Sequence, residues 1–458
     1  MARLHAACGL EFAAERKPLL VSVRSGAPVS MPGMMDTLLN IGLTDATLRG
    51  LLRLTGNPRM VWDSYRRLLQ QFAEVVHAAN PAPFRVALET AMQRARVARA
   101  QELDFRSLAA LAKEYLGLFE SVTGKAFPQN PFDQLEAAIG AVFDSWRSAR
   151  AVEYRRMHDI PEDMGTAVTV QRMVFGNAGG RSGSGVGFTR DPASGENRLY
   201  LDFRFNSQGE DVVAGRHGAN DAPRLGVALP AVAAQLQSLR GVLESEFGDA
   251  QEFEFTVQDG VLWLLQTRDA KRTPWAALRI AVEQVRAGEL AAAAARRRLA
   301  GIDLACIEQR RVALDAANEL LAGALPASIG VATGSIALDA ETAQAYAAAG
   351  RPAILVREDT STADLVGIAA AQGTLTARGG RTAHAAVVAR QLGKACLVGC
   401  TALRIDSVAR RVSFGDRRLG EGETITLDCE NGRVLAGEAR VLVEKPTEWL
   451  HELASWSV

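Results

Sequence analysis

Long hydrophobic runs and an excess of charge of either sign are both missing from this chain of 458 residues. No apolar run approaches the length that spans a bilayer, and the N-terminus lacks the apolar core of a signal peptide. The 52 lysine and arginine residues balance the 52 aspartate and glutamate residues, so no net field favours nucleic acid or an anionic membrane. These absences predict a cytoplasmic protein with no nucleic-acid or membrane partner.

Cysteine is scarce and follows no recognisable pattern. The five cysteines form no CxxC pair and no zinc-ligand spacing, and their odd number favours a reducing compartment. Cys396 and Cys400 lie in mostly apolar sequence, where a buried thiol is the common arrangement. Internal repeats are also missing, and the only low-complexity stretch is the alanine run Ala291–Ala295.

The remaining composition is that of a globular protein. Hydrophobic residues make up 48% of the chain and charged residues 23%. The length allows roughly two to four domains, each with its own core.

The first third of the chain alternates between strand and helix patterns. Leu19–Gly26 and Thr166–Val174 have strand character. Between them, from about Asp45 to Met157, apolar residues recur at three- and four-residue spacing, which predicts a helical insertion. The clearest helical segments are Val61–Val76, Ser107–Thr123 and Asp133–Arg156.

The middle of the chain carries a hairpin signal. Phe253–Val257 and Val261–Gln266 flank Gln258-Asp259-Gly260, a turn typical of two-residue hairpins. A glycine run, Gly183–Gly187, has glycine at every second position before a strand. We expect helices over about Trp275–Leu299 and again over Ile307–Leu321, the second acting as an interdomain connector. Short strands, turns and one or two helices then run to about Gly437, and Ala439–Val458 reads as a connector helix.

One stretch predicts chemistry. Gly379 and Gly380 permit a tight turn, after which Thr382 can cap a helix that places His384 in its first turn. The positive end of a helix keeps an imidazole neutral and stabilises an anion beside it, as a phosphorylated histidine requires. The apolar face of this helix is expected to be Ala385, Val388, Ala389 and Leu392. A histidine that merely caps an ordinary helix is the alternative.

The wider segment from Thr374 to Arg390, with Gly393-Lys394 and Gly399-Cys400, resembles the phosphohistidine domain of the pyruvate, phosphate dikinase and phosphoenolpyruvate synthase family. The resemblance implies that His384 carries a phosphoryl group. The likeness extends almost continuously from about Leu19 to Gly437. It is carried by Val21–Gly26, Ser30–Thr37, Asp63–Arg67, Gly209–Gly215, Glu252–Phe255 and Leu265–Arg268, which resemble the ATP-grasp nucleotide domain of the dikinases.

Phosphoryl transfer needs cations, a divalent metal and a pliant backbone at the phosphates, and the resemblance assigns residues to each part. Arg24 and Arg268 would clamp phosphate oxygens with support from Gln266, and Arg67 with Glu210 and Asp211 would handle the terminal phosphate and its acceptor. Backbone groups of Met173 and Val174 would meet the adenine. Gly183, Ser184 and Gly185, in the glycine run, would let backbone N–H groups approach the triphosphate.

Glu252 and Glu254 predict a magnesium site. They lie two residues apart on a strand, hence on one face, and offer oxygen ligands. The family usually has aspartate at the first position, so the side chain that would bind the metal at Glu252 is longer by one methylene group. Each assignment has a structural alternative: an ion pair for Arg24 or Arg268, an exposed strand face for the glutamates, and a turn for Glu210 and Asp211.

The resemblance implies an α/β, multidomain fold. We expect an ATP-grasp-type nucleotide-binding domain over residues 1–305 with its helical insertion at about 45–160, a linker over 306–323, a compact swivelling phosphohistidine domain over 324–437 and a connector over 438–458. The implied cofactor and substrates are Mg²⁺, ATP and phosphate.

Two parts of the family pattern are not found. Met1–Lys17 contains no Gly-Gly-Lys-Gly segment, and nothing after Val458 supplies the barrel that binds pyruvate or phosphoenolpyruvate. The chain thus looks like the middle of a dikinase. The expected function is ATP- and phosphate-dependent phosphorylation of His384, with AMP and pyrophosphate as products and onward transfer to pyruvate on a separate barrel domain or subunit. A non-catalytic phosphohistidine carrier and a kinase for another small acceptor stay open as alternatives.

Overall fold

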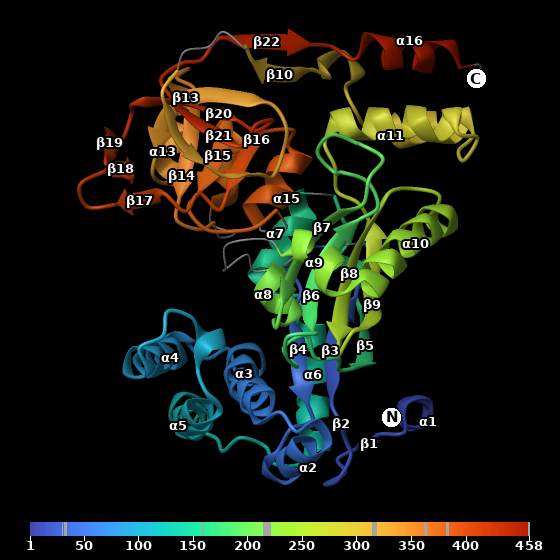
Figure 1. Ribbon diagram of the computed structural model, residues 1–458, viewed down its shortest axis with the longest axis vertical. Helices are drawn as coiled ribbons and strands as arrows, with labels where there is room; N and C mark the ends of the chain where they lie inside the picture. Colours follow the sequence, from blue (N-terminus) through green and yellow to red (C-terminus); the bar gives the residue numbers. More distant parts are fainter. Residues whose placement is uncertain are drawn as a thin grey trace. The chain divides into compact units, whose positions relative to one another are not determined.

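The computed structural model of this chain describes residues 1–29, 31, 34–157, 159–213, 221–313, 318–360, 364–381 and 384–456 (Figure 1). Of Met157, Glu210, Val213, His384, Ala385 and Gln391 only the backbone is described. The chain divides into two compact units, Met1–Ala178 and Gly179–Val458. The domain boundaries expected after residues 305, 323 and 437 stay predictions.

The first unit is built on a three-stranded antiparallel sheet in the order β4–β3–β5. Its strands are β3 (Val21–Gly26), β4 (Thr37–Ile41) and β5 (Ala167–Arg172), which confirms both strand predictions. Helix α6 (Pro131–Ser145) packs on β3 and β4, and one apolar cluster joins the sheet to the helices. The other elements before the insertion are α1 (Ala2–Cys8), β1 (Glu11–Phe12) and β2 (Pro18–Leu19).

The helical insertion is confirmed. It contains α2 (Asp45–Thr55), α3 (Pro58–Val76), α4 (Ala82–Ala95), α5 (Phe105–Thr123), α6 and α7 (Ala149–Met157), with 3₁₀ turns at Ala100–Glu102 and Glu162–Met164. Thr44, Asn57, Asp104 and Asn130 cap four of these helices through their side-chain oxygens, as short polar residues do.

Asp133–Arg156 is not one helix, which corrects the sequence pattern. The chain turns between α6 and α7, and Arg155 folds back so that its Nη1 donates to the carbonyl oxygen of Trp146 at 2.6 Å. The same guanidinium lies 4.1 Å from the centroid of the Trp146 ring. These contacts satisfy the end of α6 and stabilise a break that helical periodicity alone does not reveal.

The second unit begins with a four-stranded antiparallel sheet in the order β7–β6–β8–β9. Its strands are β6 (Gly183–Phe188), β7 (Tyr200–Phe205), β8 (Gln251–Gln258) and β9 (Val261–Asp269), and the hairpin predicted between β8 and β9 is confirmed. Helices α9 (Ala222–Ala228) and α10 (Pro230–Phe247) cover one face of the sheet (Figure 1). Helix α8 (Gly209–Val213) contacts β6.

The glycine run is itself a central strand, not a loop before a strand. Its backbone pairs with β7 on one side and β8 on the other. Phenyl rings fill the space above the glycines: a Cβ at position 185 would lie 2.6 Å from Cζ of Phe255. The same holds for Gly183 against Phe203 and for Gly187 against Phe253. We therefore correct the expectation that these glycines free backbone N–H groups for a triphosphate, because the ladders already use those groups.

The later part of the second unit contains an eight-stranded mixed sheet in the order β11–β21–β20–β13–β14–β15–β16–β12. Strands β13, β14, β15 and β16 run parallel to one another, and helices α13, α14 and α15 connect them, as parallel strands require. On the outer sides, β13 pairs antiparallel with β20 and β16 with β12. A separate three-stranded meander is formed by β17, β18 and β19. The mixed α/β class is thus confirmed.

The bounds of these elements follow. They are β11 (Leu320–Gly323), β12 (Leu325–Pro326), β13 (Val331–Ala337), α13 (Ala340–Ala348), β14 (Ala353–Arg357), α14 (Leu365–Ala370), β15 (Gly373–Thr376), α15 (His384–Gln391), β16 (Ala395–Val398), β17 (Leu403–Asp406), β18 (Arg411–Phe414), β19 (Arg417–Gly420), β20 (Thr424–Asp428) and β21 (Arg433–Ala436).

The two connectors of this region lie side by side. Strand β10 (Gln309–Val312), after α11 (Pro274–Arg286), α12 (Ala292–Leu299) and the 3₁₀ turn Leu304–Cys306, pairs antiparallel with β22 (Val441–Glu444) (Figure 1). The helix expected over Ile307–Leu321 is therefore wrong, because pairing with a strand from the far end of the chain sets its backbone. Helix α16 (Thr447–Ser455) follows and packs on α11 through Trp449 and Trp275, whose ring centroids are 5.2 Å apart.

No helix of the described residues is both long and apolar enough to cross a membrane.

Candidate active site

One face of the sheet β7–β6–β8–β9 carries charge. Glu252 in β8 stands directly opposite Arg268 in β9, and their side chains form an ion pair through Oε1 and Nη2. Glu252 is buried, at 4% exposure, so Arg268 neutralises a carboxylate that is largely removed from water.

The neighbouring residues on this face follow from the two-residue period of a strand. Glu254 shares the face of Glu252 and stands opposite Gln266. Across β6, Phe188 lies opposite both Glu252 and Tyr200, and Val186 lies opposite both Glu254 and Asp202. We call this surface the charged face and define it by Phe188, Tyr200, Asp202, Glu252, Glu254, Gln266 and Arg268.

The donor set of the charged face fits a magnesium ion. Glu252 and Glu254 offer carboxylate oxygens from one side of one strand, and Mg²⁺ binds one or two protein carboxylates together with phosphate oxygens and water. Among the described residues no group of three His, Cys, Asp or Glu side chains could hold a metal. Phosphate and water would therefore complete the coordination, and Glu252 would exchange Arg268 for the ion.

The turn that leads to His384 lies against the charged face. The guanidinium carbon of Arg381 is 4.8 Å from the centroid of the Tyr200 ring. Gly380 lies so close to Asp202 that a Cβ at position 380 would be 2.8 Å from its Oδ2. The structure therefore brings the segment before His384 to the same surface as the two glutamates.

His384 is the first residue of α15, as predicted. The free N–H groups of a helix start point outward there and favour negative charge. The expected cap, Thr382, lies outside the described residues, and so does the side chain of His384. The apolar face is partly corrected: Ala386 and Ala389 are fully buried, whereas Leu392 is 46% exposed.

The cysteines near this helix are structural, as their apolar neighbours predict. Cys396 and Cys400 are fully buried. Burial raises the pKa of the Cys396 thiol to about 12, so it stays protonated and unreactive at neutral pH.

Three predicted residues lie around the sheet of the first unit. Arg24 in β3 donates from Nη1 to Oε1 of Gln171 at 3.5 Å. Met173 and Val174, which follow β5, are each 7% exposed, and the N–H of Met173 donates to the carbonyl of Leu20 at 2.9 Å. That N–H is committed to the fold, so any adenine contact from Met173 would use its carbonyl.

Arg67 belongs to a buried ion network in α3. Its Nε lies 2.9 Å from Oδ2 of Asp63, and Nη2 of Arg66 lies 2.7 Å from Oδ1 of the same carboxylate. Burial by itself would raise the pKa of Asp63, but the charges and hydrogen bonds of Arg67 and Arg66 hold it well below its ordinary value. Asp63 therefore stays ionised and anchors Arg67.

The other predicted residues of the second unit have local partners. The Oγ of Ser184 lies 3.0 Å from Oγ1 of Thr256 across the strands and is fully buried. The carboxylate of Asp211, at the start of α8, accepts from the N–H of Gln208 at 3.2 Å. The side chain of Glu210 lies outside the described residues.

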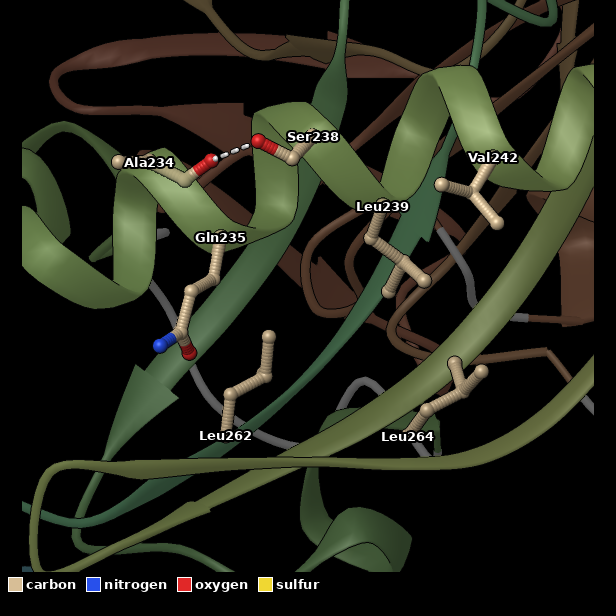
Figure 2. A pocket seen from close by; sticks show the side chains of 7 residues that line it. All are labelled: Ala234, Gln235, Ser238, Leu239, Val242, Leu262 and Leu264. Atoms are coloured by element: carbon tan, nitrogen blue, oxygen red, sulfur yellow. Dashed lines mark hydrogen bonds between the residues drawn. The ribbon is translucent and has the colours of Figure 1, made fainter.

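An apolar groove of about 470 Å³ runs between α10 and β9 (Figure 2). Leucines line it from both sides, including Leu239, Leu262 and Leu264. None of the predicted site residues is in it, so the groove is not the predicted nucleotide site.

Comparison with known proteins finds a matching family for each of two segments of the chain. Residues 2–227 match the family described as pyruvate phosphate dikinase, AMP/ATP-binding domain, and residues 350–432 match PEP-utilising enzyme, mobile domain. The chain thus combines an AMP/ATP-binding domain of the pyruvate phosphate dikinase type with the mobile domain of PEP-utilising enzymes. Glu252, Glu254, Gln266 and Arg268 lie between the two matched segments.

Whole relatives agree with this assignment. The chain is 43% identical to pyruvate, phosphate dikinase of Clostridium symbiosum over 94% of its own length and 50% of the relative. It is 40% identical to the Rhizobium meliloti dikinase over 99% of its length and 52% of that relative, and 42% identical to chloroplastic dikinase 1 of Arabidopsis thaliana over 98% and 47%. The chain thus spans about half the length of these dikinases.

Sequence reasoning missed the residues that join the two parts of the site. Tyr200 and Asp202 alternate with apolar residues in Tyr200–Phe205, a pattern that could have marked a polar strand face. Arg381 precedes the helix of His384 and Arg390 lies in its last turn, and sequence spacing does not distinguish such positions from solvent-exposed ones. Only the folded chain shows that the two guanidinium groups lie against aromatic rings, Arg381 against Tyr200 and Arg390 against Phe188.

Proposed function

We propose that this chain transfers a phosphoryl group from ATP to His384 in the presence of orthophosphate, with AMP and pyrophosphate as products. In the balanced reaction, the bond between the α,β-bridging oxygen and the β-phosphorus breaks as a bond from the imidazole nitrogen to that phosphorus forms, which releases AMP. An orthophosphate oxygen then bonds to the γ-phosphorus as the bond from the β,γ-bridging oxygen to the γ-phosphorus breaks, which releases pyrophosphate and leaves one phosphoryl group on His384. The imidazole proton leaves to solvent. Onward transfer to pyruvate would use a separate barrel domain or subunit.

One observation carries this proposal. The turn before His384 lies on the charged face through the contacts of Arg381 with Tyr200 and of Gly380 with Asp202. An acceptor histidine at that place would lie close to the carboxylates that are proposed to hold Mg²⁺, which favours transfer. Glu252 and Glu254 would bind the ion, and Arg268, released from Glu252, would bind phosphate oxygens bidentately.

The connectors support a domain that moves between two sites. Because β10 and β22 pair with each other, the two chain segments that connect the phosphohistidine region to the rest of the unit lie side by side. A hollow of about 330 Å³ lies beside this hinge, between the start of α11 and the segment Gly393–Ala395. A single attachment next to open space suits a swivel, which one histidine needs to serve two reaction centres.

Intact mass spectrometry tests the proposal. Incubation with ATP, Mg²⁺ and orthophosphate is expected to add the mass of one phosphoryl group and to release AMP and pyrophosphate. His384→Ala should abolish the gain, whereas His451→Ala, an exposed histidine in α16, should keep it. An unchanged mass of the unaltered chain in the complete mixture would overturn the proposal.

A further inference from the structure

Arg390 is a charged side chain buried at the junction of the two parts of the site. It lies in the last turn of α15 and is 1% exposed. Its Nη1 donates to the carbonyl oxygens of Arg381 at 2.7 Å and of Ala327 at 3.0 Å. Since helical side chains lean toward the N-terminus, the guanidinium reaches back to the turn that precedes His384.

The other edge of this guanidinium is unpaired. Neither Nε nor Nη2 has a hydrogen-bond acceptor among the described residues, although both atoms are buried. Such donors are expensive to leave unsatisfied, which implies that an acceptor binds there in some state of the protein. The Nε–Nη2 edge is the side of arginine that binds carboxylate or phosphate with two parallel hydrogen bonds.

The guanidinium of Arg390 lies beside the charged face. The guanidinium carbon lies 5.6 Å from the centroid of the Phe188 ring, and Phe188 stands opposite Glu252 in the sheet. Burial lowers the pKa of Arg390, while the negative charges of Glu252 and Asp191 act in the opposite direction and Arg268 adds to the lowering. Arg390 therefore adds positive charge where phosphates are proposed to bind.

We infer that Arg390 donates its Nε–Nη2 edge to oxygens of the phosphoryl group as that group passes from the nucleotide to His384. The inference rests on the proposed function and deepens it: the phosphohistidine domain would supply both the acceptor and a cation for the transition state. Arg390 keeps its protons throughout, and the bonds that form and break are those given above. Charge that spreads over the phosphoryl oxygens is what such a cation stabilises.

Glu252 is the competing acceptor for this edge. Its carboxylate already binds Arg268, so a second guanidinium would have to share it. A phosphate brings its own oxygens and accounts for the unpaired edge whether Glu252 binds Arg268 or the metal ion. The two acceptors can be distinguished by experiment. A contact with Glu252 would form without nucleotide, whereas a contact with phosphate would form only during transfer.

Single-turnover phosphorylation of the full chain separates these roles. Arg390→Met is expected to lower the rate at saturating ATP by about 10²–10³-fold, with the dissociation constant of ATP unchanged within about twofold. Arg390→Lys keeps a charge without the fork and should recover only part of the rate. The matched control is Arg411→Met, which removes an exposed arginine of the meander and should phosphorylate normally.

A second phosphoryl donor distinguishes chemistry from local structure. Phosphoramidate phosphorylates imidazoles without a nucleotide, so Arg390→Met should accept phosphoryl from it at a near-normal rate. Equal ATP-dependent rates for Arg390→Met and the unaltered chain would overturn the inference. So would a parallel loss with both donors, or a loss confined to ATP affinity. An unaltered chain that phosphoramidate labels but ATP does not would instead overturn the proposed function itself.

Discussion

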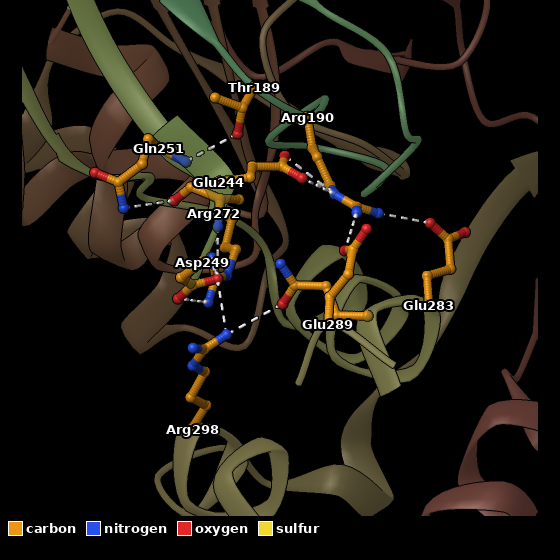
Figure 3. A network of polar contacts seen from close by, with 11 residues as sticks. Thr189, Arg190, Glu244, Asp249, Gln251, Arg272, Glu283, Glu289 and Arg298 are labelled. Atoms are coloured by element: carbon orange, nitrogen blue, oxygen red, sulfur yellow. Dashed lines mark hydrogen bonds and ion pairs between the residues drawn. The ribbon is translucent and has the colours of Figure 1, made fainter. Parts of the chain in front are cut away.

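Two buried arginines of the second unit have opposite surroundings. Arg190, 2% exposed, lies among three glutamates, with 3.2 Å to Glu244, 2.9 Å to Glu283 and 3.7 Å to Glu289 (Figure 3). Arg390 is as deeply buried, yet its hydrogen bonds go to two neutral carbonyls, and its Nε and Nη2 have no partner among the described residues.

The difference separates a structural charge from a functional one. Arg190 joins the segment after β6 to α10 and α11 through Glu244 and Glu283, and the pair Arg272–Asp249, at 2.8 Å, lies nearby (Figure 3). Its partners are complete, so it holds elements together. A buried cation without such partners weakens the fold and is retained where a ligand supplies the missing charge.

The largest expected effect on stability is at Arg190. Arg190→Met removes the buried charge that Glu244, Glu283 and Glu289 surround, so the free energy of unfolding should fall by about 3–5 kcal/mol. Phosphorylation of the folded protein should be unaffected. Chemical denaturation followed by circular dichroism measures the loss, and a single-turnover assay measures the rate.

Arg279→Met is the matched control, since Arg279 also binds Glu283, at 2.7 Å, but is 29% exposed. It should cost less than about 1 kcal/mol. If Arg190→Met were no more destabilising than this control, or if it slowed phosphorylation as strongly as Arg390→Met, the contrast between the two arginines would fail.

A third buried arginine, Arg66, forms an ion pair with Asp63 whose contribution to stability depends on pH. The folded-state pKa of its partner Asp63 is lowered from the ordinary 3.8, so the pair stabilises the fold fully above that value. As the pH falls below it, the unfolded chain takes up the proton more readily and the stabilisation is lost. Asp63→Asn should remove a pH-dependent contribution of roughly 2–3 kcal/mol.

Unfolding titrations of both proteins between about pH 7 and pH 3 measure this contribution. The stability gap between the unaltered chain and Asp63→Asn should narrow as the solution is acidified. A gap of constant size across that range would show that ionisation of Asp63 does not stabilise the fold.

The smallest effect is expected at Phe188. Phe188→Leu keeps an apolar side chain but removes the ring face beneath Arg390, which should weaken that contact by about 1 kcal/mol. If the same energy is lost from the transition state of transfer, the ATP-dependent rate should fall roughly fivefold. Tyr346→Leu is the control, because it removes a similar ring 4.5 Å from Arg351, outside the charged face. Identical rates for the two variants would contradict the role given to Phe188.

Local patterns predicted much of the fold. Helix periodicity located α3 and α5, and the turn Asp259-Gly260 adopts positive φ at both residues, as its hairpin requires. The errors arose where contacts with residues distant in sequence determine the local structure. Gln309–Val312 and Leu320–Gly323 form strands because β22 and β21 pair with them, and the glycines of β6 accommodate phenyl rings from neighbouring strands.

The site shows the same division. Alternation on β8 placed Glu252 and Glu254 on one face, and the folded sheet adds Arg268 and Gln266 opposite them. The contact of Arg390 with Phe188 could not be predicted, because it joins residues about 200 positions apart and depends on how two regions pack. Its chemical meaning comes from which donors stay unpaired, and sequence spacing carries no information about that.

The most direct measurement follows an isotope through the reaction. The chain is incubated with Mg²⁺, orthophosphate and ATP that carries a radioactive label on either the β- or the γ-phosphorus, and labelled peptides are then mapped. The account predicts that the β-label appears on the peptide of His384 and the γ-label in pyrophosphate. Transfer of the γ-label to the protein, or β-label on any other residue, would contradict it.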